Sequence, residues 1–467
     1  MNTERLRQLD KAHVWHPFTP MQEYVREETP VIASGDGFYL YDTDNRRYLD
    51  GVSSLWCNVH GHWVPEIDAA LRAQLDLVSH STLLGLANVP SIELAHELVQ
   101  VAPPGLTRVF FSDDGSTAVE AALKMAWQYH RQKAGGGDRR DLFLCLSGAY
   151  HGDTLGAVSV GGIDRFHQVY KGLLFDVLHV PTPVAFRTPP GFNPAGYLEW
   201  CAEQLEQVFR TQGERIAAFV IEPLVQAAAG MLVHPAGYLR RVRELTAEYG
   251  ALLIADEVAV GFGRTGTLFA CEQEQIIPDM LCLSKGLTGG YLPLGATLTT
   301  DTVYNEFLGE PAEGRTFFHG HTYTGNPLGC AAGLASLRLF ETNHVLENVA
   351  TNTAYLEQRL SVLGDHPHVG EVRQKGVIVG IELVRDRDSN IAFPPSARIG
   401  HRVTLAARQR GAIIRPLGDI IEIFPAPAMP LRTLDELCGI VCDAIDAVLS
   451  QPPPSDSRKG DFVLDRE

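Results

Sequence analysis

Two apolar runs in the middle of the chain each end in a charged residue. The run over 251–255 is followed by Asp256, and the run over 280–283 is followed within two residues by Lys285. Short, continuous apolar runs predict strands buried on both faces, as in mostly parallel sheets. Ligands of such sheets bind at the carboxyl ends of the strands, so Asp256 and Lys285 are well placed to meet one ligand.

Lys285 is the more unusual of these two residues, because burying an ammonium group costs free energy. Partial burial lowers the pKa of a lysine, and a neutral amine is a nucleophile that can attack an aldehyde. The alternative is a lysine at the sheet edge with its head in water. Gly286 follows directly and favours a backbone crowded against a ligand. For Asp256, the alternative is a helix N-cap or loop acid.

A third segment offers a place for an anion. The strand predicted over 109–112 leads to Gly115 and Ser116, where a helix begins at once. Free N–H groups and the helix dipole favour a phosphate there, although an ordinary N-cap is the commoner reason for such a segment. Together, the three segments meet the needs of pyridoxal phosphate, which requires an amine, a carboxylate for its pyridine nitrogen and an anion site.

The rest of the chain predicts an α/β architecture. With 467 residues, two or more domains are expected. We predict an N-terminal segment over 1–62 that joins the small domain, a large cofactor-binding domain over 63–335, a small α+β domain over 336–450, and a disordered tail over 451–467. The large domain alternates helices with strands, and the strands are expected at Arg108–Ser112, Leu142–Leu146, Ala157–Val160, Ala217–Ile221, Ala251–Ala255, Met280–Leu283 and Ala296–Thr299.

Composition and spacing exclude several classes of protein. A formal net charge of −17 argues against nucleic acid or an anionic membrane as the main partner. We expect a cytoplasmic protein, since no run suits a signal peptide or a membrane span and the eight cysteines form no C-x-x-C pair. No metal is predicted, because the histidine pairs at 60/62 and 319/321 lack a carboxylate or cysteine at ligand spacing.

Longer segments resemble the class III aminotransferases, pyridoxal-phosphate enzymes with the fold of aspartate aminotransferase. These segments, within a similarity over roughly residues 10–450, are IADEVAVGFGRTGTLFACE, SKGLTGG, DDGSTAVEAALKMA, SGAYHGDTLGAVSVGG and HGHTYTGNPLGCAAG. The resemblance implies that Lys285 holds the cofactor and that Asp256 pairs with its ring nitrogen. It assigns the remaining cofactor contacts to Gly115, Ser116, His321 and Thr322. Because Thr322 would come from the neighbouring subunit, a homodimer with shared sites is expected.

Within this family, WHPFTPM, DGVSSLWCNVHGH, HSTLLGLANVP and RPLGDIIEIFPAP resemble the enzymes of biotin biosynthesis that convert 8-amino-7-oxononanoate to 7,8-diaminononanoate. The resemblance places Tyr150 against the cofactor ring and the substrate. It places Trp56 and Gly320 at the substrate pocket, and Arg415 on the substrate carboxylate. Without the resemblance, a core aromatic residue explains Tyr150 or Trp56 and a surface ion pair explains Arg415.

The resemblance implies S-adenosylmethionine as the amino donor, with lysine as the alternative. Phe18 stands where members that use adenosylmethionine commonly have tyrosine, and His321 stands where many of them have proline. Another class III enzyme, an ω-amino-acid or diamine aminotransferase, is a further alternative. The other alternative is a non-enzymatic or NAD-dependent protein, which only the G-x-G-x-x-G pattern over 261–266 supports. The residues that follow this pattern lack a helical periodicity.

Overall fold

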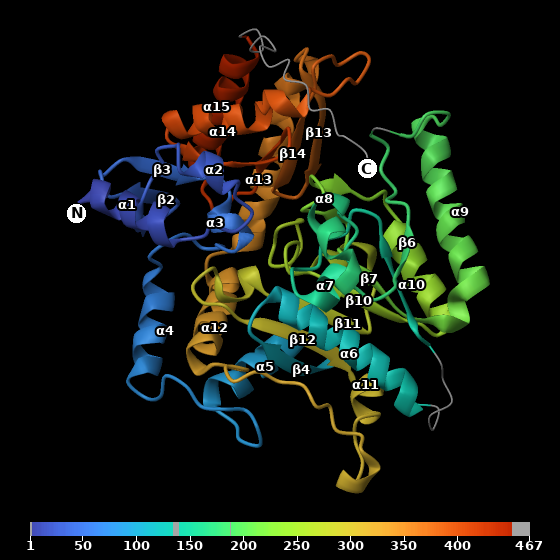
Figure 1. Cartoon of the computed structure of the whole chain (residues 1–467). Helices are drawn as coiled ribbons and strands as arrows, with labels where there is room; N and C mark the ends of the chain where they lie inside the picture. The colour runs from blue at the N-terminus through green and yellow to red at the C-terminus, as the bar shows by residue number, and fades with distance from the viewer. Residues whose placement is uncertain (1, 134–139, 187, 451–467) are drawn as a thin grey trace, which may run out of the picture.

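The structure, a computed structural model, describes residues 2–133, 140–186 and 188–450. Its larger part is built on a seven-stranded sheet in the order β4-β12-β11-β10-β7-β5-β6 (Figure 1). Adjacent strands from β11 to β6 run parallel, and β12 is antiparallel to both of its neighbours. The mostly parallel sheet is therefore confirmed. Its strands are β4 (Leu106–Ser112), β5 (Leu142–Leu146), β6 (Leu178–Val180), β7 (Ile216–Ile221), β10 (Leu252–Asp256), β11 (Met280–Leu283) and β12 (Gly295–Thr300).

Six of the seven predicted strands belong to this sheet. The strand predicted at Ala157–Val160 is wrong, because this segment forms most of helix α7 (Leu155–Ser159). The carboxylate of Glu120 accepts a hydrogen bond from the backbone N–H of Gly156 at 2.7 Å, which satisfies a donor in the first turn of α7. A short apolar run does not distinguish a buried strand from a buried helical turn.

Helices cover the sheet. Helix α6 (Gly115–Lys133) follows β4 and packs against β12, β11, β10 and β7. Helices α5 (Val89–Val101) and α12 (Pro327–Thr342) pack against each other, and α5 also contacts β4. Helices α9 (Pro194–Gln212) and α10 (Tyr238–Tyr249) lie together towards the β6 end of the sheet (Figure 1). The central strands β7 and β10 are consequently buried along their whole length.

The N-terminal and C-terminal segments lie side by side at one end of the molecule (blue and orange to red in Figure 1). In the N-terminal segment, β2 (Tyr39–Asp42) and β3 (Arg47–Asp50) pair in antiparallel orientation. With β1 (Ile32–Asp36) they form a sheet whose fourth strand is β15 (Ala412–Ile413). The domain boundaries stay a prediction, and the tail predicted over 451–467 lies outside the described residues.

Another four-stranded sheet, antiparallel throughout and in the order β13-β14-β17-β16, completes the C-terminal part. Its strands are β13 (Val369–Lys375), β14 (Ile378–Leu383), β16 (Arg415–Leu417) and β17 (Ile420–Ile423). Helices α14 (Ile399–Gln409) and α15 (Leu431–Leu449) pack together beside it. The remaining elements are α1 (Thr3–His13), α2 (Met21–Tyr24), α3 (Ser53–Trp56), α4 (Pro65–Leu75), α8 (Asp164–His167), β8 (Val225–Gln226), β9 (Leu232–Val233), α11 (Asp301–Asn305) and α13 (Val345–Leu360).

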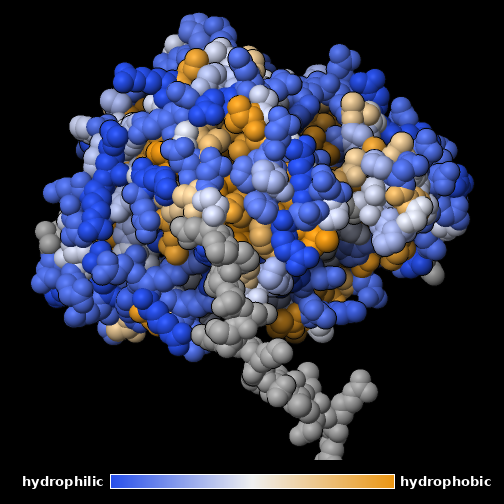
Figure 2. Space-filling view, turned by 90° about the horizontal axis from the view of Figure 1, so that it is seen from above, coloured by the Kyte–Doolittle hydropathy of each residue, from blue (hydrophilic) through white to orange (hydrophobic). Residues whose placement is uncertain are grey.

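Hydrophilic residues predominate on the face seen from above, and hydrophobic residues show between them in smaller groups (Figure 2). Most large apolar side chains instead lie in the core between the sheets and their helices. Among the described residues, no helix is both long enough and apolar enough to cross a membrane.

Candidate active site

A cavity of about 410 Å³ lies at the carboxyl ends of the central strands. Helix α6 and the N-terminal segment also contribute to its walls. Of the site residues predicted from the sequence, those that line the cavity are Trp56, Gly115, Ser116, Tyr150, Asp256 and Lys285. The predicted residues that do not line it are Gly320, His321, Thr322 and Arg415.

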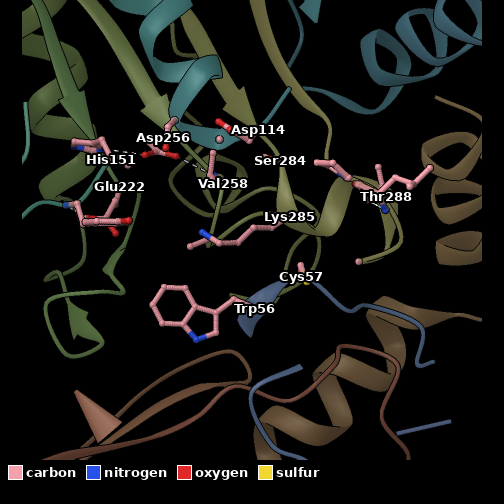
Figure 3. A pocket seen from close by; sticks show the side chains of 18 of the residues that line it. Trp56, Cys57, Asp114, His151, Glu222, Asp256, Val258, Ser284, Lys285 and Thr288 are labelled. Carbon is pink, nitrogen blue, oxygen red and sulfur yellow. Dashed lines mark hydrogen bonds and ion pairs between the residues drawn. The ribbon is translucent and has the colours of Figure 1, made fainter. Parts of the chain in front are cut away.

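Asp256 and Lys285 meet in this cavity because their strands are parallel neighbours. Asp256 is the last residue of β10 and pairs with Cys282 of β11, so the ends of both strands open at the same edge of the sheet. Lys285 then has a φ of +45°, in the left-handed region that non-glycine residues seldom adopt. Its side chain extends between Glu222 on one side and the ring of Trp56 on the other (Figure 3).

The surroundings of Lys285 favour a neutral amine. Burial lowers the pKa of Lys285, and the nearby carboxylates of Asp256 and Glu222 oppose this shift without cancelling it. Its Nζ atom lies 5.3 Å from the centroid of the Trp56 ring. A lysine with a lowered pKa in a cavity is suited to attack an aldehyde and to carry a proton.

Asp256 is held by two hydrogen bonds. His151 Nδ1 lies 2.7 Å from Asp256 Oδ2, and the backbone N–H of Val258 donates to Asp256 Oδ1 at 3.0 Å (Figure 3). Both side chains of the His151–Asp256 pair are buried. Each carboxylate oxygen has a second lone pair, so Asp256 can still accept a hydrogen bond from a ligand.

Glu222 is a cavity residue that the sequence analysis missed. It directly follows β7, the strand beside β10, and it accepts hydrogen bonds from Tyr150 N at 3.1 Å and Ala227 N at 3.0 Å. Burial raises the pKa of Glu222 to about 7. The sequence signal that could have identified Glu222 is the one used for Asp256, namely an acid immediately after a buried strand. His151 was likewise given no role, since its partner is remote in sequence.

The N-terminus of α6 forms the part of the cavity suited to an anion. Asp114 Oδ1 accepts the backbone N–H of Thr117 at 2.8 Å, whereas the N–H groups of Gly115 and Ser116 precede the first intrahelical hydrogen bond. Gly152 has a φ of +122°, and a Cβ atom there would overlap Ser116. The Gly152 segment therefore needs glycine to pack so closely against the first turn of α6.

Trp56 reaches the cavity from a left-handed turn. The four residues Ser53–Trp56 have φ values from +43° to +70°, a conformation that costs non-glycine residues about 1–2 kcal/mol each. Two hydrogen bonds hold the turn, from Ser53 Oγ to Phe424 O at 2.8 Å and from Ser54 Oγ to Asp50 Oδ2 at 2.7 Å. The Trp56 ring stacks on Phe424 with centroids 5.0 Å apart. Strain of this kind is typical of functional sites.

Tyr150 lines the cavity, whereas Arg415 lines a second groove. Tyr150 Oη donates to Asp153 Oδ2 at 2.8 Å, and burial raises the pKa of Tyr150 while the positive charge of Arg415 opposes the shift. Arg415 lines the second groove with Phe18, and its Cζ lies 5.9 Å from the Phe18 ring centroid. Arg415 is thus close enough to influence Tyr150 without lining the cavity itself.

Gly320, His321 and Thr322 lie apart from the cavity, on an irregular segment between η5 (Pro311–Glu313) and α12. Gly320 and Thr322 are exposed, and His321 Nδ1 lies 3.0 Å from Asp113 Oδ2. Within a single chain these three residues do not reach Lys285. Among the described residues, no group of three or more His, Cys, Asp or Glu side chains could hold a metal ion.

The sequence matches the family model of the class III aminotransferases over residues 23–449. The chain belongs to the class III aminotransferases. One class III relative, the adenosylmethionine-8-amino-7-oxononanoate aminotransferase of Nitratidesulfovibrio vulgaris, is 56% identical over 446 residues, which cover 96% of this chain and 82% of the relative.

Solved structures agree with the family assignment. The adenosylmethionine-8-amino-7-oxononanoate aminotransferase of Methanocaldococcus jannaschii superimposes with a TM-score of 0.90 at 42% identity, covering 96% of this chain and 99% of that chain. An ω-transaminase of Pseudomonas jessenii, solved in complex with PMP, superimposes with a TM-score of 0.90 at 29% identity, covering 95% and 98% of the two chains. The expected aspartate-aminotransferase-like fold is thereby confirmed.

Class III aminotransferases use pyridoxal phosphate, and the cavity has groups that fit each part of it. Lys285 offers an amine with a lowered pKa. Asp256 has an acceptor position left for a ring N–H, and the first turn of α6 offers N–H groups for the phosphate. All three lie on the wall of one cavity.

Proposed function

We propose that this class III aminotransferase transfers an amino group to 8-amino-7-oxononanoate, giving 7,8-diaminononanoate in biotin biosynthesis. The names of similar proteins support the acceptor. The relatives from Nitratidesulfovibrio vulgaris and Geobacter sulfurreducens are 56% and 51% identical to the chain and carry this acceptor in their names. The observation on which the chemistry rests is Lys285, an amine whose pKa is lowered by burial, in a cavity shared with Asp256 and the N-terminus of α6.

In this proposal each residue of the cavity has a separate role. Lys285 would hold the cofactor, and its amine would move the proton at the reacting carbon of the substrate. Asp256, oriented by His151, faces the ring nitrogen, while Gly115 and Ser116 bind the phosphate. Bound pyridoxal phosphate supplies an electron sink for the carbon–hydrogen bond that breaks.

The remaining assignments concern the substrate and the second subunit. Trp56 and Tyr150 would flank the apolar chain of the acceptor, and Arg415 would bind its terminal carboxylate as a bidentate partner. Gly320, His321 and Thr322 would complete the site of a neighbouring subunit in a cytoplasmic homodimer. The exposure of Gly320 and Thr322 in the single chain supports this role.

S-adenosylmethionine is the first candidate donor, because it appears in the names of the relatives. Lysine is the second candidate. Phe18, which stands where users of adenosylmethionine commonly have tyrosine, lies beside Arg415 in the second groove and so adjoins the proposed carboxylate site.

A donor screen with the purified holoenzyme tests the proposal. Each donor is mixed with the protein alone, and bleaching of the cofactor absorbance is followed. Then 8-amino-7-oxononanoate is added and 7,8-diaminononanoate is measured by mass spectrometry. We expect adenosylmethionine to support product formation. Product with lysine alone would reverse the order of the donors. Turnover of β-alanine or putrescine without any use of 8-amino-7-oxononanoate would refute the proposed acceptor.

A further inference from the structure

Glu422 of β17 is a buried acid that none of the roles above uses. Its side chain is 0% exposed, and neither carboxylate oxygen has a hydrogen-bond partner among the described residues. The other deeply buried acids differ, since Glu222 and Glu257 each accept two backbone N–H groups. An unpaired buried carboxylate is costly, so its position calls for an explanation.

Glu422 faces Arg415. The two residues pair directly across the antiparallel strands β16 and β17, so their side chains lie on the same face of the sheet. Among the described residues no acid, Glu422 included, forms an ion pair with Arg415. Of the acids that line the second groove with it, Glu23 pairs with Arg398, Glu27 pairs with His401, and Asp419 accepts a hydrogen bond from the backbone N–H of Gly400. The carboxyl and the guanidinium are therefore neighbours that do not form a salt bridge.

Few other polar groups face Glu422. From α3, the indole nitrogen of Trp56 approaches it, and this Nε1 atom is also buried without a hydrogen-bond partner. On the other neighbouring strand, β14, the residue opposite Glu422 is Gly380, which has no side chain. A change in the charge of Glu422 therefore affects mainly Arg415 and Trp56. Arg415 is proposed to bind the substrate carboxylate, and Trp56 is proposed to flank the substrate chain.

We infer that Glu422 is a positioning residue that controls how strongly Arg415 binds a substrate carboxylate. When Glu422 is uncharged, it does not compete with the substrate carboxylate for Arg415. When it is ionised, it becomes the counterion of Arg415 and the substrate carboxylate binds more weakly. The inference rests on the proposed function, in which Arg415 binds the carboxylate of the acceptor.

The ionisation of Glu422 falls in a pH range in which enzyme kinetics can be measured. Burial raises the pKa of Glu422 to about 8, and Arg415 and Trp56 limit the rise. A bound carboxylate would raise this pKa further by repulsion, so acceptor binding above pH 8 is accompanied by proton uptake at Glu422. Such coupling weakens binding by up to about tenfold per pH unit above the pKa of the unliganded site.

The test compares KM for two acceptors between pH 6.5 and 9.5, with wild-type holoenzyme and the Glu422→Gln variant. One acceptor is 8-amino-7-oxononanoate, and the other is a ketone of matched length without a carboxylate. Ionisations of the cofactor, and of an amino group present in both acceptors, cancel in the ratio of the two KM values. We expect this ratio to rise about 3- to 10-fold from pH 7 to pH 9 in the wild type and to stay constant in Glu422→Gln. The effect on kcat should not follow this profile.

Glu371→Gln is the matched control. Glu371 belongs to β13, at the opposite edge of the same sheet, and pairs with Arg373 instead of Arg415. In this variant the ratio of the two KM values should rise with pH as it does in the wild type. An equal rise of this ratio in Glu422→Gln would overturn the inference. If that variant does not fold, the wild type alone decides, because a ratio that does not change with pH contradicts the inference. Failure of the wild type to use 8-amino-7-oxononanoate at any pH would refute the proposed function itself, and the inference with it.

Discussion

His151 and Asp256 form a buried pair in which His151 Nδ1 lies 2.7 Å from Asp256 Oδ2. The two residues are 105 positions apart in the chain, and the sheet brings them together. Because Asp256 faces the cavity, the histidine sets the direction in which its carboxylate points. The pair therefore links the architecture of the sheet to the chemistry of the site.

The His151→Phe variant tests this positioning. Phenylalanine keeps an aromatic ring but cannot donate a hydrogen bond to Asp256. A hydrogen bond to a charged group contributes about 1.5–3 kcal/mol, so we expect kcat to fall about 10- to 100-fold and cofactor affinity to weaken. Steady-state kinetics and titration of the apoprotein measure both. His179→Phe is the control, since His179 bonds Gly161 O at 2.9 Å away from the cavity. Equal behaviour of the two variants would show that His151 is merely structural.

Replacement of Lys285 by alanine removes the only group proposed to hold the cofactor covalently. After treatment with borohydride, wild-type protein should carry the cofactor mass on the peptide that contains residue 285, and the Lys285→Ala protein should carry none. Because the same amine is the proposed base, kcat should fall at least about 10³-fold. The Lys171→Ala variant changes an exposed lysine and should behave as wild type. Covalent cofactor in Lys285→Ala at another lysine, with turnover intact, would refute the assignment.

The Gly152→Ala variant probes the anion site proposed at the N-terminus of α6. The added Cβ would lie 2.8 Å from Ser116 Cα at a φ of +122°, so the loop or the helix must move. A strain of about 1–3 kcal/mol at the proposed phosphate site predicts cofactor binding weaker by about 5- to 150-fold. The dissociation constant of the apoprotein for pyridoxal phosphate is the measurement. Gly172→Ala is the matched control, because its Cβ would meet nothing within 4 Å. Unchanged affinity in Gly152→Ala would argue against a phosphate there.

Glu422 also predicts how stability depends on pH. Its pKa rises from 4.5 to about 8 on folding, so between these values the folded chain holds a proton that the unfolded chain has lost. The free energy of unfolding therefore falls as the pH rises through this range. Glu422→Gln has no such group. Relative to this variant, the wild-type apoprotein should lose about 2–3 kcal/mol between pH 6 and pH 9, seen as a Tm lower by a few degrees at pH 9. Parallel Tm curves would show that Glu422 does not titrate with the raised pKa.

Local sequence patterns were enough to predict the sheet and the centre of the site. Asp256 and Lys285 each follow a continuous apolar run, and both lie at the predicted strand ends. The pattern was insufficient at Ala157–Val160, because four apolar residues suit a buried helical turn as well as a strand. Glu222 was overlooked even though it follows a buried strand in the same way.

By itself, the sequence determined the order of strands and helices and which chemical groups stand at strand ends, since both depend on neighbouring residues. Only the tertiary structure decided which distant groups meet. The pairing of His151 with Asp256 depends on the order of strands in the large sheet, and the alignment of Arg415 with Glu422 depends on the register of β16 and β17. Burial decided the rest, because the pKa shifts of Lys285 and Glu422 arise mainly from the removal of water by residues remote in the chain.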